Sequence, residues 1–166
     1  MYSDLQAAKD SVYDPCHFTC SEPLMEAESV EYGACTFQLN NRSVLFRIAK
    51  ITPTKVGLFV AIWKRIQSGS TQPYDVSDSV DFFIISVRKD NNFGQFIFPK
   101  SVLAKHDIIS IEGQGGKRGI RVYPPWENNL NRQAQKTQEW QVQYFLNIPQ
   151  NGVVDIDRAQ MLYSSV

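Results

Sequence analysis

The chain has 166 residues, of which seventeen are basic, seventeen are acidic and 43% are hydrophobic, so its net charge is zero. This length suits one ordinary domain, and the composition is that of a globular protein. No run approaches the roughly 18 apolar residues that a membrane span requires, and the start of the chain is acidic and polar, unlike a signal peptide. We therefore predict a cytoplasmic protein with no membrane insertion.

The N-terminal half of the chain is predicted to consist mainly of strands. Residues 1–15 suit a short helix that ends at a proline. Residues 34–51 form two predicted strands around Asn40-Asn41, a pair that tolerates left-handed backbone. Residues 56–65 form a third strand with apolar side chains on both faces, so we expect it to be central and covered on both sides.

The C-terminal half alternates strand and helix signals. A polar loop at residues 67–79 precedes a clear hairpin at residues 80–99, and a short helix follows. Another strand is predicted at residues 119–123, and the strongest helix signal covers residues 131–147. These elements predict one α+β domain over residues 1–166, with a mostly antiparallel or mixed sheet flanked by N-terminal and C-terminal helices.

Basic and acidic residues are separated along the sequence. Residues 1–31 hold seven acids and one base, whereas residues 32–74 hold six bases and no acid. Five of these bases lie in or beside the predicted strands: Arg47, Lys50, Lys55, Lys64 and Arg65. Such asymmetry indicates a polyanion partner, and we interpret the five as phosphate contacts left unpaired for a ligand. We also expect the acidic segment to pack on the sheet core, and the alternative is that it neutralises these bases within the chain.

A second basic cluster follows the glycine-rich turn at residues 113–119. It contains Lys117, Arg118 and Arg121, and a turn of this composition can cradle a phosphate through its backbone N–H groups. The turn precedes a predicted strand rather than a helix, so it is not a nucleotide-binding P-loop. Trp126, on the proline-rich connector that follows, is a further candidate contact because exposed aromatic side chains stack on bases.

Cysteine and histidine residues do not complete a metal site. Cys16, His17 and Cys20 have the local spacing of half a zinc site, but only Cys35 and His106 remain as further ligands of this kind. Three cysteines without a secretion signal favour reduced thiols. We therefore predict no bound metal and no cofactor.

The order of the predicted elements calls for comparison with metal-dependent nucleases. Enzymes of the restriction-endonuclease type place a metal-binding acid two residues before a lysine on a core strand. Here Ile48 and Ile62 occupy those positions before Lys50 and Lys64, and isoleucine cannot bind magnesium. A nuclease would need acids from elsewhere in the chain: Glu31, Asp75, Asp78 or Asp81.

Several sequence blocks, taken together, resemble the MepB family. They are FRIAKITPTKVGLFVAIWKR, PYDVSDSVDFFIISV, GQFIFPKSVL, GKRGIRVYPPW and KTQEWQVQYF, and they span roughly residues 31–146. The resemblance implies a small bacterial cytoplasmic protein with an endonuclease-like core, and the family's type member is encoded beside a multidrug efflux pump and its regulator. It implies a nucleic-acid-binding role and supplies no site residues.

These observations predict a non-catalytic protein that binds DNA or RNA through a basic surface of strands and turn. Its core would be a degenerate restriction-endonuclease-like fold that binds without cutting. Two alternatives stay open. One is a divergent metal-dependent nuclease, and the other is a protein-interaction module accessory to drug efflux regulation, in which the basic face meets an acidic partner such as the N-terminal segment of a second copy in a homodimer.

Overall fold

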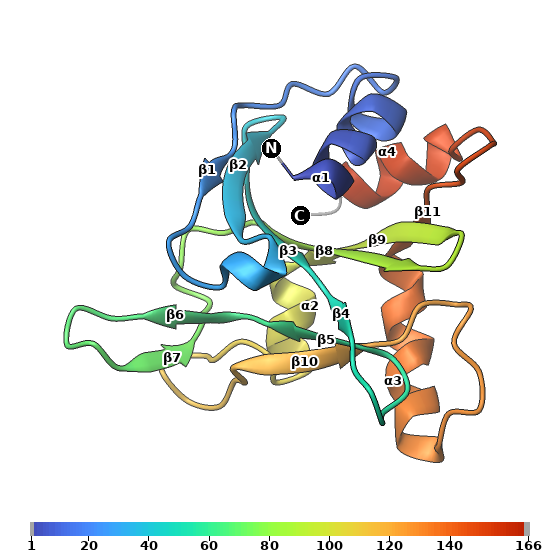
Figure 1. Ribbon diagram of the computed structural model, residues 1–166. Coiled ribbons are helices and arrows are strands. Elements are labelled where there is room, and N and C mark those ends of the chain that lie inside the picture. Colours follow the sequence, from blue (N-terminus) through green and yellow to red (C-terminus); the bar gives the residue numbers. More distant parts are fainter. Residues whose placement is uncertain (1, 165–166) are drawn as a thin grey trace.

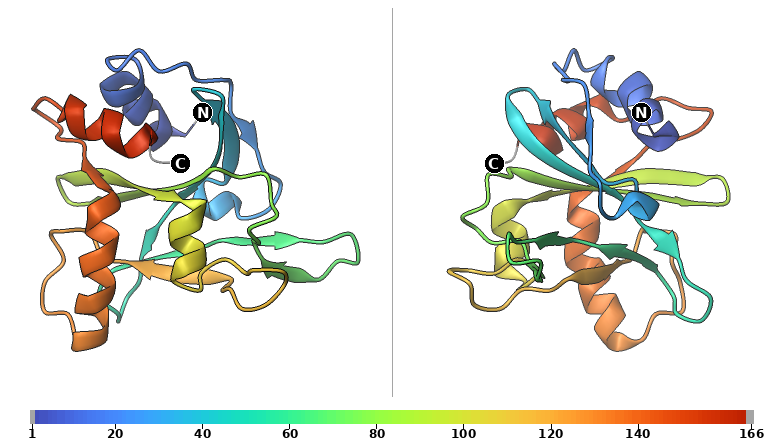
Figure 2. Two further views of the ribbon diagram at one scale, coloured as in Figure 1. Left: turned by 180° about the vertical axis from the view of Figure 1, so that it is seen from behind. Right: turned by 60° about the vertical axis from the view of Figure 1, so that its left-hand side comes forward.

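The computed structural model describes residues 2–164 and arranges them in layers (Figure 1). A six-stranded sheet crosses the middle of the molecule, and helices α1 (Ser3–Ala8) and α4 (Ile156–Ser164) lie on one side of it. On the other side lie α2 (Lys100–Lys105), α3 (Arg132–Gln141) and a three-stranded sheet, an arrangement that can be followed in both views of Figure 2.

The strands form three sheets. The six-stranded sheet has the order β1-β2-β3-β8-β9-β11, and its neighbours are antiparallel except for the parallel pair β3 and β8. Its strands are β1 (Leu24–Met25), β2 (Cys35–Leu39), β3 (Arg42–Ile48), β8 (Phe82–Lys89), β9 (Asn92–Pro99) and β11 (Phe145–Asn147). The three-stranded sheet has the order β10-β5-β4, and β6 pairs with β7 to form the third sheet. These strands are β4 (Lys50–Ile51), β5 (Leu58–Ala61), β6 (Trp63–Arg65), β7 (Thr71–Pro73) and β10 (Gly119–Val122).

The predicted α+β class, with a mixed sheet flanked by helices, is confirmed. No helix within residues 2–164 is both long and apolar enough to cross a lipid bilayer. Helix α1 continues as a π-helical turn at Lys9–Tyr13, and short 3-10 helices form at Val30–Tyr32 and Val142–Tyr144.

Two predicted elements differ from the structure, and one helix was not predicted. The strand expected at residues 56–65 divides at Ile62 into β5 and β6, because β6 leaves the three-stranded sheet to pair with β7. The helix expected at residues 131–147 ends earlier, because Phe145 pairs with Phe96 and so begins β11. Helix α4 was not predicted, and it is α4 that accompanies α1 on the outer face of the sheet.

Two apolar cores form because successive side chains of a strand point to opposite faces of the sheet. In β8, Phe82 and Ile84 pack with α1 and α4, whereas Phe83 and Ile85 pack toward the three-stranded sheet. Strand β5 is central in that smaller sheet, as predicted. However, Phe59 on its outer face is only partly buried, so β5 is not fully covered on both sides.

A buried polar contact joins both ends of the chain to the middle of the sheet. The hydroxyls of Tyr13 and Tyr163 donate hydrogen bonds of 3.1 and 2.6 Å to Oε1 of Gln95 in β9. Burial raises the pKa of both tyrosines, so both stay protonated and can act as donors. The N-terminal and C-terminal helices are thereby docked on one side chain.

Three ion pairs connect the acidic segment, residues 1–31, to the strands. They are Asp4–Arg88 at 2.8 Å, Glu26–Arg47 at 2.9 Å, and Glu28–Arg65. The side chain of Arg47 is fully buried, and both of its Nη atoms donate to the carboxylate of Glu26. A buried charge requires such partners, because its removal from water costs several kcal/mol.

We predict that Glu26→Ala lowers the free energy of unfolding by about 3 kcal/mol, because it leaves the buried guanidinium of Arg47 without its carboxylate. Glu28→Ala is the matched control, since Arg65 is exposed and pairs of this kind contribute less than about 1 kcal/mol. Urea unfolding followed by circular dichroism measures both variants. Equal losses in the two variants would contradict the structural importance of the buried pair.

The carboxylate of Asp75 organises the loop that leads into β8. It accepts hydrogen bonds from Ser110 Oγ at 2.6 Å, from the backbone N–H and the hydroxyl of Ser77 at 2.9 and 2.8 Å, and from Gly113 N at 3.0 Å. The bond from Ser110, followed by those from Gly113 and Ser77, holds the pKa of Asp75 well below its usual range. The ionised carboxylate therefore joins this loop to the glycine-rich turn.

Asp78 and Asp81 also act as loop anchors. Asp78 forms an ion pair of 2.6 Å with Lys64 and accepts a hydrogen bond from the backbone of Asp75. Asp81 accepts a hydrogen bond of 2.8 Å from the backbone N–H of Ser43 at the start of β3. Each carboxylate is thus engaged by groups of the chain itself.

We predict that Asp75→Asn lowers the melting temperature at neutral pH. The amide of asparagine replaces one hydrogen-bond-accepting oxygen with an NH2 donor, which faces the donors of Ser77, Ser110 or Gly113. Since the folded pKa of Asp75 lies below the unfolded value of about 4, its stabilising effect is complete above that pH and is lost as the pH falls below it. The difference from the parent protein should therefore shrink between about pH 5 and pH 2.

Thermal unfolding at a series of pH values measures this effect. Asp90→Asn is the control, because Asp90 is exposed at a hairpin tip and its positive φ of 55° also suits asparagine. A difference for Asp75→Asn that stays constant with pH would contradict the ionised anchor.

Candidate nucleic-acid interface

Three of the predicted phosphate contacts are engaged by acids within the chain. Arg47 is buried against Glu26, Lys64 pairs with Asp78, and Arg65 pairs with Glu28. The expectation that these strand-borne cations are unpaired is therefore wrong. Its cause is the acidic segment together with one loop aspartate, which the fold brings over β3 and β6. We leave these three cations out of the candidate site.

Two other predicted contacts have no carboxylate partner among the residues that the structure describes. Lys50 lies over the ring of Tyr32, with its Nζ 4.6 Å from the ring centroid, and it is partly buried. Lys55 is exposed on the loop between β4 and β5, and the structure shows no hydrogen bond or ion pair for its ammonium group. Lys55 is therefore available to a ligand, whereas Lys50 is partly occupied by an aromatic ring.

The three residues of the second basic cluster differ in exposure and in their hydrogen-bond partners. Lys117 is exposed, and its ammonium group has no partner within residues 2–164. Arg118 donates hydrogen bonds to the carbonyl and the hydroxyl of Thr71, which attaches the glycine-rich turn to β7. Arg121 is partly buried and donates to Thr52 Oγ1 at 2.7 Å and more weakly to two carbonyls of the same loop. Its positive charge is not neutralised by any of these groups.

Trp126 is not the exposed aromatic contact that its connector suggested. Its indole packs edge-on against Phe145, with ring centroids 5.6 Å apart, and its Nε1 is buried without a hydrogen-bond partner in the described part of the chain. The connector therefore turns this side chain into the protein. The ring is only partly exposed, so we leave Trp126 out of the candidate site.

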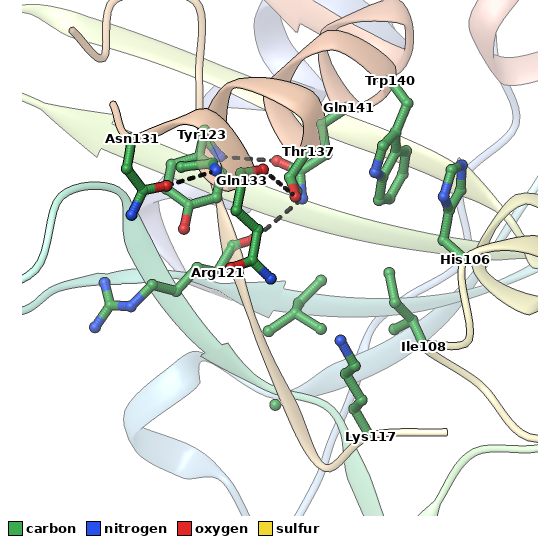
Figure 3. A pocket seen from close by; sticks show the side chains of 13 residues that line it. His106, Ile108, Lys117, Arg121, Tyr123, Asn131, Gln133, Thr137, Trp140 and Gln141 are labelled. Carbon is green, nitrogen blue, oxygen red and sulfur yellow. Dashed lines mark hydrogen bonds between the residues drawn. The ribbon is translucent and has the colours of Figure 1, made fainter. Parts of the chain in front are cut away.

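Lys117 and Arg121 line a hollow of about 440 Å3 between β10 and α3 (Figure 3). A second hollow, of about 400 Å3, lies beside it and is lined by Lys55 and again by Arg121. The two hollows also share Tyr123, Asn131 and Ala134, so they are immediate neighbours along β10 and the start of α3, and we treat them as one depression. We call this depression the β10 trough.

The lining of the β10 trough carries positive charge and no negative charge. Lys55, Lys117 and Arg121 contribute three cations, and no aspartate or glutamate lines either hollow. The other polar groups of the lining include carboxamides and hydroxyls, such as those of Asn131, Gln133 and Thr137 in Figure 3. Positive charge without a carboxylate nearby attracts anions most strongly, so this arrangement suits phosphate groups.

An aromatic pair forms one end of the larger hollow. The imidazole of His106 stacks on the indole of Trp140, with ring centroids 3.9 Å apart and an interplanar angle of 8°. Burial, followed by the nearby charge of Lys105, lowers the pKa of His106, so the imidazole is mostly neutral at pH 7. The pair is therefore an uncharged, partly exposed wall that faces Lys117 across the hollow (Figure 3).

A buried glutamine fixes the distance between the two sides of the trough. Gln141 of α3 accepts a hydrogen bond of 2.8 Å from Tyr123 N and donates one of 3.0 Å to Arg121 O. Three residues of the trough were not predicted as contacts from the sequence: His106, Trp140 and Gln141. A signal was present for Gln141, because it lies seven residues after the buried Ala134 and so on the same face of the helix.

The residues considered for a metal site are dispersed or engaged. All three cysteines carry free thiols, and burial raises the pKa of Cys35 to about 12. Ile62 is fully buried, whereas Glu31 is exposed on a 3-10 helix. Within residues 2–164, no three side chains of the His, Cys, Asp or Glu types lie together as a metal-binding group.

Comparisons with known proteins identify the family. The family model described as MepB-like matches residues 26–147. A solved structure titled "Crystal Structure of MepB" is 34% identical, with a TM-score of 0.77, and the match covers 92% of this chain and 99% of that chain. A search of curated proteins found no match. The matched range contains β10, α3 and the whole lining of the trough, and the chain belongs to the MepB-like family.

Proposed function

We propose that this protein is a non-catalytic nucleic-acid-binding protein that contacts phosphates through the β10 trough. One observation carries the proposal: the trough gathers Lys55, Lys117 and Arg121 and has no carboxylate in its lining. Contacts between phosphates and Lys or Arg supply most of the non-specific affinity of proteins for nucleic acids. Because the trough extends from the glycine-rich turn to the loop after β4, it offers more than one phosphate position.

The division of the other cations supports the same site. Arg47, Lys64 and Arg65 each have a carboxylate at ion-pair distance, so their charge is offset where it stands. Lys55 and Lys117 have no such partner in the described residues. A chain of zero net charge therefore retains a local excess of positive charge at the trough.

In our proposal the endonuclease-like core binds nucleic acid without cutting it. The acids that a nuclease would have to use are Glu31, Asp75, Asp78 and Asp81. Glu31 is exposed on a 3-10 helix, and each of the three aspartates already accepts hydrogen bonds or forms an ion pair within the chain. Withdrawing them for a metal would disrupt the loop that they hold. Ile48 and Ile62 stand at the positions where a strand-borne acid would be required.

The protein-interaction alternative has less support from the charges. In that alternative an acidic partner, including the acidic segment of a second copy, would meet the basic face. Three acids of this segment, Asp4, Glu26 and Glu28, instead pair with arginines of their own chain. A cytoplasmic location is part of our proposal, and a link to drug efflux rests on the family resemblance alone.

We predict that the purified protein binds DNA or RNA with dissociation constants of about 10⁻⁶ to 10⁻⁴ M near physiological salt. Lys117→Ala and Lys55→Ala should each weaken binding to every sequence alike. Each should also reduce the slope of log K against log salt by about one, because each removes one phosphate contact. Fluorescence anisotropy titrations at several salt concentrations measure both effects.

Two control variants accompany this experiment. Arg65→Ala should leave the salt slope unchanged because Arg65 pairs with Glu28. Lys136→Ala should do so because this exposed lysine of α3 does not line the trough. If neither duplex nor single strands bind at low salt, the proposed function is wrong. If Arg65→Ala changes the slope as much as Lys117→Ala does, the phosphates are bound elsewhere.

We also predict no cleavage of plasmid or RNA in magnesium or manganese, because the candidate aspartates hold the loop before β8 and isoleucines stand at the strand positions where a metal-binding acid is required. The measurement is gel electrophoresis of the nucleic acid after prolonged incubation with the protein, repeated after each further purification step. Cleavage that persists through purification and disappears in Asp75→Asn, with the fold intact by circular dichroism, would instead establish the nuclease alternative.

A further inference from the structure

The larger hollow of the β10 trough is small and walled. Its volume of about 440 Å3 lies within the range of pockets that hold a single small molecule. β10 forms its floor, α3 one side, and the stacked pair of His106 and Trp140 one end. A hollow of these dimensions accommodates one nucleotide unit, whereas a double helix could contact only its rim.

The floor of this hollow is an open strand edge. β10 is the outermost strand of its sheet. Ile62 N donates a hydrogen bond to Arg118 O, and this bond determines which residues of β10 point their backbone groups toward β5 and which point them away. Residues 118, 120 and 122 therefore bond toward β5, whereas Gly119 and Arg121 direct their backbone groups toward the hollow. The N–H of Arg121 and both backbone groups of Gly119 have no hydrogen-bond partner among the residues described.

The open part of this edge is too short to receive another strand. Gln141 already occupies Arg121 O and Tyr123 N with its carboxamide, so the edge is closed beyond Arg121. About three adjacent backbone groups remain, whereas a peptide that adds to a sheet pairs along several residues. Three donors and acceptors in one plane do match the hydrogen-bonding edge of a nucleobase.

The helix side of the hollow adds groups of the same kind. The carboxamide of Gln133 has no hydrogen-bond partner within residues 2–164, and Asn131 uses its Oδ1 to cap α3, which leaves its amide nitrogen free. Carboxamides are the side chains that pair most readily with base edges. Lys117 reaches in from the strand side and, with Arg121, is one of the two cations that line this hollow (Figure 3).

We infer that this hollow takes one unpaired base of a single-stranded nucleic acid, with the adjoining phosphate at Lys117. The inference rests on the proposed function and deepens it. In a duplex the Watson–Crick edge of each base is already paired, so only an unpaired base can present that edge to β10 and Gln133. The remaining phosphates follow the trough toward Arg121 and Lys55.

The test compares three fluorescein-labelled ligands at one salt concentration, using the full chain. They are a mixed-sequence single-stranded 12-mer, the corresponding 12-base-pair duplex, and a 12-mer of the same backbone in which every base is replaced by an abasic unit. We expect the single strand to bind about tenfold more tightly than the abasic strand and more tightly than the duplex, because one engaged base contributes about that factor.

Two variants locate the base. Thr137→Phe narrows the hollow from α3, and Gln133→Ala removes the free carboxamide. Both should reduce the preference for bases while leaving the salt slope, and hence the phosphate contacts, unchanged. Gln143→Ala is the matched control, because Gln143 is exposed and does not line the hollow. Circular dichroism melting verifies that each variant is folded.

The outcomes separate the two proposals. Equal affinity for the single strand and the abasic strand, or a preference that survives Thr137→Phe and Gln133→Ala, overturns the base site and leaves phosphate binding standing. Failure of all three ligands to bind overturns the proposed function itself. A preference for the single strand that both variants reduce and Gln143→Ala does not supports the base site.

Discussion

The two hydrogen bonds of Gln141 are the constraint on which the β10 trough depends. They join the C-terminal end of β10 to the last turn of α3, two elements that are otherwise separated by the hollow. Because the carboxamide replaces the strand that would normally pair there, β10 ends its sheet without exposing its whole edge. The same bonds stop at Arg121, so the edge stays open only where the hollow is.

The neighbouring residues reinforce this spacing. Gln138, one turn earlier in α3, donates to Pro124 O at 2.9 Å and so holds the connector after β10. Asn131 caps the helix at its other end through a bond of 2.9 Å from Ala134 N. A helix that is capped at its start and bonded through its last turns to β10 and the connector forms a rigid wall, and a rigid wall reduces the entropy lost when a ligand is bound.

The sequence predicted the fold class and the outline of the sheet because hydrophobic alternation and turn residues act locally. Strands β8 and β9 and the short helix α2 follow from such signals. Such local signals do not predict which cations are paired with acids in the folded chain. Arg47 and Lys117 are equally basic in sequence, yet Arg47 is buried against Glu26, twenty-one residues away, and Lys117 has no partner. Pairing of this kind depends on which distant segments the chain folds together.

Polar residues inside helices were the other source of error. The helix signal at residues 131–147 comes from apolar side chains, among them Ala134, which is buried, and Trp140, which packs against the core that faces the three-stranded sheet. It passed over Gln141, which is 1% exposed, because burial of an amide is favourable only when specific partners exist. Those partners are backbone groups at the end of β10. The sequence around Gln141 does not predict that this strand will lie beside it. Sequence reasoning therefore found the basic half of the trough and not the wall that shapes it.

Zero net charge does not argue against an anion site in this chain. At physiological ionic strength, charges are screened beyond about 8 Å, so a carboxylate elsewhere on the surface has little effect on a phosphate in the trough. What matters is the local set of charges. Acids of the N-terminal segment neutralise arginines on β3, β6 and β8 at close range, and Asp78 does the same for Lys64. These acids therefore offset the charge of cations in the sheets and do not line the trough. The cations of the trough keep their attraction for phosphate.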